Sequence, residues 1–304
     1  MSAKGLVLLA MNWRDDSPFI RLRCSDASHS DLVPAAGLAL NYRLGKHVER
    51  ACLGHVPFRK GRNEYHDCST PLQASSRRCE RCTIVEATFA SNLHHAHTRG
   101  RSEIDPAIRE HLAQPNQLYL AAFRDGSIKI GTSTLTRVQT RLAEQGAWIA
   151  RFAAIADDGF AVRDLEDRVT AELGLPQAVG VGRKISGLIS PVDDAELNER
   201  LDRHLKDVVA LIDTMNDRRI EASDRRWRNP VAEDPVLDNM LRYPLKLRSG
   251  SHDLEIVGAI GRVCAARRPG TTDVFAIDPG ELFGIKIETG NFASDEIAIQ
   301  DSLF

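Results

Sequence analysis

Apolar residues recur along this chain with two periods, and the period changes between its ends and its centre. Alternating or continuous apolar runs predict strands, whereas apolar residues three and four apart predict helices. The predicted strands are residues 4–13, 19–24, 37–44, 118–123, 128–132, 148–156, 254–260, 262–266, 274–277 and 282–287. The predicted helices are residues 104–112, 134–145, 160–173 and 193–215. The pattern therefore predicts an α+β fold with β-rich ends and a mixed centre.

Breaks in this pattern predict five segments. They are an N-terminal β segment (1–50), a Cys-rich module (51–112), a mixed domain that ends in a long helix (113–215), an Arg-rich linker (216–242) and a C-terminal β unit (243–304). Neither β segment alone supplies a comfortable sheet, so we expect the N-terminal strands to complete the C-terminal unit. The Gly-rich residues 180–187 lack the spacing of a nucleotide-binding fingerprint and are predicted to form a loop.

A β-hairpin is predicted over residues 117–133, with its turn at Gly126. A two-residue loop would place Tyr119 and Lys129 on opposite faces of the sheet. A three-residue loop with Gly126 in the left-handed region would pair Tyr119 with Gly131 and Ala121 with Lys129. We expect this second register, which places Tyr119, Lys129 and the bare backbone of Gly131 on one surface.

The hairpin resembles a GIY-YIG domain, with Leu118-Tyr119 at the first motif and Lys129-Ile130-Gly131 at the second. With residues 141–147 and the preceding cysteines, the chain is similar to a prokaryotic family that joins a zinc-binding module to a GIY-YIG-like domain, in a Lys-Ile-Gly variant. The resemblance covers roughly residues 40–185. It implies a small antiparallel sheet flanked by helices, together with nuclease activity, and makes Gly131 the candidate cofactor-binding position.

The resemblance also assigns candidate catalytic residues. Tyr119 takes the place of the base that activates water, and Glu166 on the helix after the third strand takes the place of the Mg²⁺ ligand. Arg141 is the nearest match to the arginine that follows the second motif, although Arg137 competes for that role. Lys129 stands where these nucleases carry a second tyrosine; it offers a point charge for phosphate but no phenol.

Cysteines are concentrated in the second segment. Four of the six in the chain are Cys52, Cys68, Cys79 and Cys82. Four thiolates at this spacing are typical of a tetrahedral structural zinc site. Two alternatives remain: His55 with three of the cysteines, or a site that includes His66. We expect Cys24 and Cys264 to be buried apolar residues.

Three histidines, His94, His95 and His97, lie in a polar stretch that ends at Ser102, where a solvated loop is expected rather than a second metal site. The arginines between residues 59 and 101 could contact phosphates, but acidic residues are interleaved with them.

Composition narrows the function further. A hydrophobic content of 42% and a charged content of 27% are ordinary for a globular protein. The net charge of −2 argues against tight non-specific coating of nucleic acid, although a local basic patch can still bind it. The apolar run 6–11 is too short for a signal peptide or a membrane span, so we expect a cytoplasmic protein without a membrane partner.

Three functions fit these observations. The first is a Mg²⁺-dependent nuclease or phosphodiesterase that acts on nucleic acid and contains a structural zinc. The second is a non-catalytic nucleic-acid-binding protein on the same scaffold. The third is a scaffold recruited for a biosynthetic reaction on a small anionic metabolite, which the near-neutral net charge favours.

Overall fold

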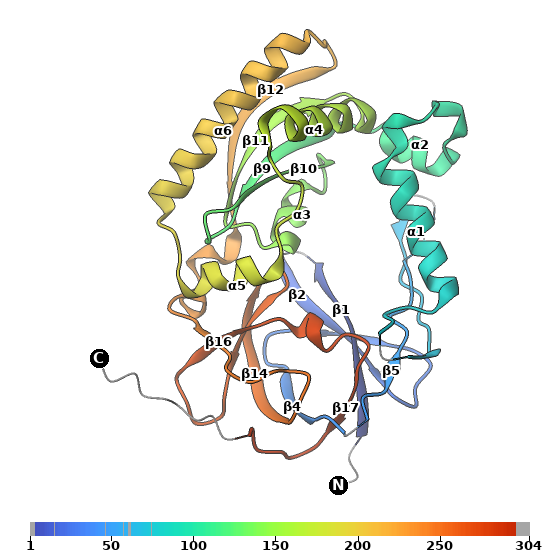
Figure 1. Ribbon diagram of the computed structural model, residues 1–304, viewed down its shortest axis with the longest axis vertical. Helices are drawn as coiled ribbons and strands as arrows, with labels where there is room; N and C mark the ends of the chain where they lie inside the picture. The colour runs from blue at the N-terminus through green and yellow to red at the C-terminus, as the bar shows by residue number, and fades with distance from the viewer. Residues whose placement is uncertain are drawn as a thin grey trace.

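The computed structural model describes residues 4–14, 16–45, 47–56, 58–59, 62–73 and 75–295. These residues form the expected α+β fold, with two main sheets that are largely antiparallel (Figure 1). No helix in the described part of the chain is both long enough and apolar enough to cross a membrane.

The larger sheet joins the two ends of the chain. Its strands are β1 (Lys4–Arg14), β2 (Ser17–Cys24), β3 (Asp31–Pro34), β4 (Ala39–Arg43), β13 (Leu241–Arg242), β14 (Ser251–Ile260), β15 (Val263–Arg267), β16 (Val274–Ile277) and β17 (Lys286–Thr289). Their order is β13-β16-β15-β14-β4-β17-β1-β2-β3, with β17 between β4 and β1. The N-terminal strands therefore complete the C-terminal β unit, as the sequence predicted, and the two β segments share one sheet.

The smaller sheet contains the predicted hairpin. Its strands are β9 (Asn116–Ala122), β10 (Ile128–Thr134), β11 (Ile149–Ala156) and β12 (Ile220–Arg228), in the order β10-β9-β11-β12. The prediction of a linker over residues 216–242 is wrong here, because residues 220–228 pair with β11 as an edge strand. The linker also contains β13 and the short helices η3 (Pro230–Glu233) and η4 (Pro235–Leu237).

Four helices surround this sheet. They are α3 (Val138–Gln145), α4 (Gly159–Leu173), α5 (Val181–Ile189) and α6 (Asp194–Met215). Helices α4 and α6 cover one face, where Leu165 and Leu201 pack against Leu118 and Leu120. Helix α5 corrects the prediction of a Gly-rich loop. It needs a glycine at position 187, because a Cβ there would lie 2.2 Å from the backbone nitrogen of Asp125 in the hairpin turn.

The Cys-rich segment forms small hairpins and a helical arm. It contains β5 (Arg50–Ala51), β6 (Phe58–Arg59), β7 (Arg62–Asn63) and β8 (Pro71–Leu72), then α1 (Glu80–His94), η1 (Ala96–Thr98), η2 (Arg101–Glu103) and α2 (Pro106–Leu112). Helix α1 was not predicted. The expected loop over residues 94–102 is instead the end of α1 followed by two short 3₁₀ turns. Helix α2 begins at Pro106, two residues later than predicted, and Asp105 caps it.

The two sheets meet where α3 ends. A Cβ at Gly261, in the turn between β14 and β15, would lie 2.5 Å from the backbone nitrogen of Gly146. The indole nitrogen of Trp13 on β1 donates a hydrogen bond to the carbonyl of Gly261 at 3.0 Å. The larger sheet therefore supports the C-terminal end of α3. A further short helix, η5 (Pro279–Glu281), precedes β17.

Candidate functional site

The hairpin adopts the predicted three-residue loop. Tyr119 pairs with Gly131, and Ala121 pairs with Lys129. The Phe123 amide donates to the carbonyl of Ser127 at 2.9 Å, and the turn between them contains a glycine at a φ of +83°. Tyr119, Lys129 and Gly131 therefore face the same side of the sheet.

Gly131 is required at its position because the phenol of Tyr119 lies across it. A Cβ built on Gly131 would lie 2.5 Å from the phenolic oxygen of Tyr119. The sequence predicted a bare backbone at Gly131. In the structure the ring of Tyr119 covers that backbone.

Tyr119 is almost fully enclosed, with 1% of its surface exposed. Its hydroxyl donates a hydrogen bond to Oε1 of Gln145, the last residue of α3, at 3.1 Å. Burial raises the pKa of Tyr119 above its ordinary value, and Arg141 opposes this shift only in part. The side chain is therefore a neutral phenol near neutral pH.

Lys129 lies beside this ring, with Nζ 5.7 Å from the ring centroid. The amine donates to the carbonyl of Gln177 at 3.2 Å. Burial lowers the pKa of Lys129 to about 8, and the positive charges of Arg141 and Lys184 add to the effect. A lysine in this environment is partly uncharged at mildly alkaline pH, so it can accept a proton.

The structure distinguishes the two candidate arginines on and before α3. Arg137 forms an ion pair with Glu144 at 3.0 Å, and its charge lowers the pKa of His111. Arg141 also lies near Glu144, at 3.7 Å, but its charge lowers the pKa of both Tyr119 and Lys129. Arg141 is therefore the arginine that belongs to the cluster.

Glu166 reaches the cluster from α4, beside the edge strand β10. Its Oε2 lies 2.9 Å from Nη1 of Arg163 and 3.4 Å from Oγ1 of Thr132. Burial raises the pKa of Glu166, while Arg163 and then Lys129 lower it. In turn, Glu166 raises the pKa of both Tyr119 and Lys129. Arg141 and Glu166 therefore both act electrostatically on Tyr119 and Lys129.

The four cysteines of the second segment come together, as the sequence predicted. The sulfurs of Cys52, Cys68, Cys79 and Cys82 all lie within 4.8 Å of one another. The backbone amide of Cys79 donates to the sulfur of Cys52 at 3.2 Å. A backbone hydrogen bond at Cys82 lowers the pKa of Cys79 to about 7, despite opposition from burial. Four such thiols could hold a metal ion such as zinc.

The two histidines considered as alternatives lie next to this cluster. Nδ1 of His55 is 3.2 Å from the sulfur of Cys82. The rings of His55 and His66 stack, with their centroids 5.2 Å apart. The set of potential ligands within reach of one ion contains the four cysteines and neither histidine.

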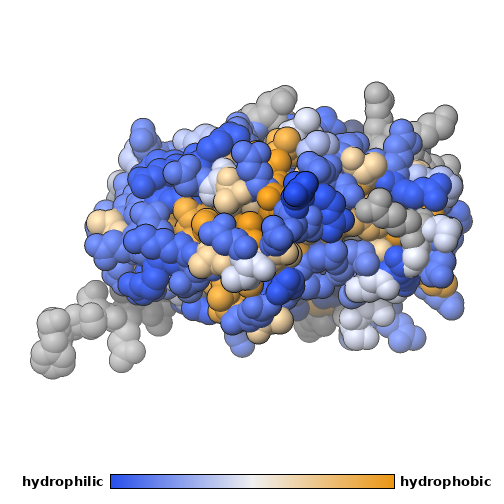
Figure 2. Space-filling model, turned by 90° about the horizontal axis from the view of Figure 1, so that it is seen from above, coloured by the Kyte–Doolittle hydropathy of each residue, from blue (hydrophilic) through white to orange (hydrophobic). Residues whose placement is uncertain are grey.

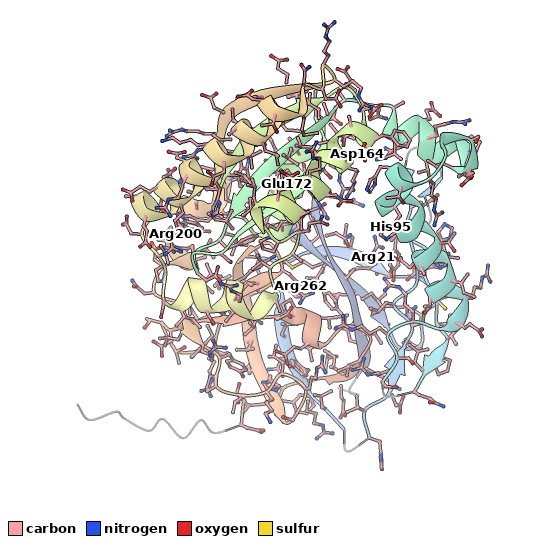
Figure 3. All side chains as sticks on the ribbon, turned by 45° about the horizontal axis from the view of Figure 1, so that its top comes forward. Arg21, His95, Asp164, Glu172, Arg200 and Arg262 are labelled. Carbon is pink, nitrogen blue, oxygen red and sulfur yellow. The ribbon has the colours of Figure 1, made fainter. Side chains whose placement is uncertain are left out.

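The histidines after α1 lie near α4. His97 pairs with Asp167 at 2.8 Å, and that carboxylate also accepts a hydrogen bond from Gln177 at 3.2 Å. In Figure 3, Asp164 marks α4 and His95 marks the neighbouring segment. No second cluster of potential metal ligands occurs among the residues that the structure describes. The side chain of His94 lies outside the described residues.

Three residues around the hairpin were not predicted from the sequence. Gln145 contacts Tyr119, Gln177 holds Lys129 through its carbonyl, and Arg163 pairs with Glu166. Arg163 had a local signal, because it precedes Glu166 by three residues on a helix and so shares its face. The two glutamines lie at a helix end and in a loop, where periodicity gives no indication of contact.

Comparison with known protein families gives no match, and neither do comparisons with curated proteins and with solved structures.

Proposed function

We propose that the chain is a metal-dependent phosphodiesterase acting on nucleic acid, with a structural zinc ion at the four cysteines. The observation that carries the proposal is the convergence of Tyr119, Lys129, Arg141 and Glu166 around the hairpin. Phosphodiester hydrolysis needs a proton acceptor for water, a cationic donor to the phosphate and neutralisation of developing charge. The cluster contains a group suited to each task.

The side chains suggest how substrate approaches. Tyr119, Lys129 and Glu166 are buried, whereas 44% of the Arg141 side chain is exposed. A phosphate therefore enters from the side of Arg141, whose guanidinium donates hydrogen bonds to the non-bridging oxygens. This contact orients the phosphorus towards the hairpin and leaves the buried groups to act on the attacking water.

Lys129 is the better proton acceptor of the two hairpin side chains. The raised pKa of Tyr119 keeps its phenol neutral, whereas the pKa of about 8 gives Lys129 a neutral fraction. While the amine donates one hydrogen to the carbonyl of Gln177, its lone pair can take the proton of water. In this scheme Tyr119 orients the water, and the tyrosine base implied by the resemblance is replaced by the lysine.

The residues beside β10 fit a magnesium ion that is shared with substrate. The carboxylate of Glu166 and the hydroxyl of Thr132 are adjacent oxygen donors, and Mg²⁺ sites commonly combine one carboxylate with water and substrate phosphates. Burial raises the pKa of Glu166 because it disfavours the charged carboxylate, and a bound cation would favour that charged form. When bound, the ion would supply neutralisation of charge on the phosphate.

Substitution of Glu166 tests this proposal. We expect the wild-type chain to cleave DNA or RNA oligonucleotides with Mg²⁺, and Glu166→Gln to lose at least about 100-fold in kcat, since one electrostatic contact in a transition state contributes this much. Glu172→Gln, an exposed change six residues later on α4, is the matched control and should keep full activity. Unchanged cleavage in Glu166→Gln would reject the proposed site.

A non-catalytic nucleic-acid-binding protein is the second candidate. It is favoured by the ion pair between Glu166 and Arg163, because a paired, buried carboxylate also satisfies a purely structural role. This function predicts oligonucleotide binding without turnover in Mg²⁺ or Mn²⁺.

A further inference from the structure

Strand β12 extends the hairpin surface beyond the candidate site. Phe152 of β11 pairs with Tyr119 on one side and with Arg225 of β12 on the other. In the next row, Ala150 pairs with Ala121 and with Trp227. Because directly paired residues point to the same face, Arg225 and Trp227 lie on the face that carries Tyr119 and Lys129.

The side chains of β12 divide cleanly between the two faces. Arg226 and Arg228 point towards α6, where they pair with Asp202 at 3.8 Å and with Asp194 at 2.6 Å. Arg225 is exposed, and no carboxylate in the described part of the chain lies within ion-pairing distance of it. The arginines facing α6 therefore have a structural partner, whereas Arg225 keeps an uncompensated charge.

Arg225 also has the geometry of a stacking platform. Its guanidinium lies over the ring of Phe152, 5.2 Å from the centroid, and Arg225 as a whole is exposed to solvent. Trp227, one row away, is half-buried, whereas the other two tryptophans, Trp13 and Trp148, are buried. An exposed guanidinium plane beside an indole resembles the combination on which unpaired bases stack.

Nearby charges indicate which part of this surface a nucleic-acid strand can contact. Glu221, which pairs with Ile155, lies four residues before Arg225 on β12, on the far side of a register shift, and would repel phosphate there. Trp227 lies on the other side of Arg225 from this carboxylate, in the row of Ala121 and Lys129. Figure 2 views the molecule from above, from the side on which α4 and α6 lie in Figure 1, and shows that this face is mostly hydrophilic, with some apolar residues near its middle.

We propose that the β12 face, defined as Arg225 and Trp227, binds a single-stranded stretch of nucleic acid that flanks the phosphate held by Arg141. This inference rests on the proposed function and specifies its substrate. Paired bases in a duplex hide their faces from a stacking platform, so the surface selects unpaired nucleotides. The net charge of −2 requires such a local contact, since no overall positive field attracts the strand.

The test compares two neighbouring arginines in the full-length chain. Binding of a 12-nucleotide oligothymidylate is measured by anisotropy over a range of salt concentrations. We expect Arg225→Gln to weaken binding at least fivefold and to reduce the slope of log K against log salt by about 0.7, the contribution of one phosphate contact on a single strand. Arg226→Gln, on the opposite face of the same strand, should bind as the wild-type chain does. Equal effects of the two substitutions would overturn the proposal.

Trp227 supplies an independent signal. Stacking of a base should quench tryptophan fluorescence on addition of oligothymidylate, and Trp227→Phe should abolish the quenching. The matching duplex should bind more weakly and without quenching; tighter binding of the duplex would also overturn the proposal. Arg225→Lys keeps the charge and should retain the salt slope while losing affinity. This second variant tests the stacking role even if Arg225→Gln fails to fold.

These results are separable from the catalytic proposal. If Glu166→Gln abolishes cleavage while Arg225→Gln binds normally, the β12 face is rejected and the active site stands. If no cleavage occurs but Arg225→Gln loses affinity, the binding face stands on a non-catalytic protein.

Discussion

Burial changes the acid–base behaviour of the two hairpin residues in opposite directions. It raises the pKa of Tyr119 and lowers that of Lys129, because in each case it disfavours the charged form. The sequence identified both residues and their shared face from the turn at Gly126. It could not indicate these pKa shifts, since they depend on the enclosure of the two side chains beside Gln145 and Gln177, which come from a helix end and a loop.

The close approach of Tyr119 to Gly131 predicts that any side chain added at position 131 destabilises the fold. Gly131→Ala places a methyl group where the phenol lies, and overpacking of this kind costs about 1–3 kcal/mol. Urea unfolding should show this loss. Gly180→Ala is the matched control, because a Cβ there meets nothing within 4 Å, and its stability should stay within about 0.5 kcal/mol. Equal stability of the two variants would contradict the packing described for Tyr119.

Elements with strong periodicity were predictable, and weakly patterned ones were not. Helix α6 shows a continuous apolar stripe, and its buried Leu197, Leu201 and Val208 match that stripe. Strand β12 was missed because it is an edge strand whose side chains are mostly charged and exposed. Helix α5 was missed because its glycines indicate a loop, whereas Gly187 serves close packing on Asp125. In each case a tertiary contact decided the structure.

The cysteine cluster gives a prediction at the element scale. We expect one zinc ion per wild-type chain after dialysis, and Cys79→Ser should lose the ion together with thermal stability, because zinc binding in such modules contributes directly to folding. Elemental analysis and thermal unfolding measure the two effects. Cys24 is exposed, so the prediction that it is buried is wrong, and it lies outside the cluster; Cys24→Ser should therefore retain both. A full zinc content in Cys79→Ser would show that this thiol is not a ligand.

At the scale of the whole molecule, the larger sheet supports the site through the end of α3. Gly146 and Gly261 bring the two backbones together, and the residue before Gly146 is Gln145, which holds the phenol of Tyr119. The sequence predicted that the two ends of the chain share a sheet. It could not predict where that sheet meets the hairpin domain, because the closest backbone approach is made by two glycines, and the apolar residues that join the two parts, such as Ile260, Val263 and Leu188, come from segments far apart in the sequence. The fold thus joins distant segments around one small cluster.

The pH dependence of cleavage tests whether Lys129 accepts the proton of the attacking water. Lys129 must be uncharged to accept a proton, so kcat should rise with pH and level off above its pKa of about 8. The measurement is oligonucleotide cleavage with Mg²⁺ between roughly pH 6.5 and 9.5, for the wild-type chain and for Lys129→Arg, which keeps the positive charge but cannot lose its proton. We predict a rise near pH 8 in the wild-type chain and little activity at any pH in Lys129→Arg. A Lys129→Arg variant that cleaves with the wild-type rate and pH profile would show that Lys129 is not the proton acceptor.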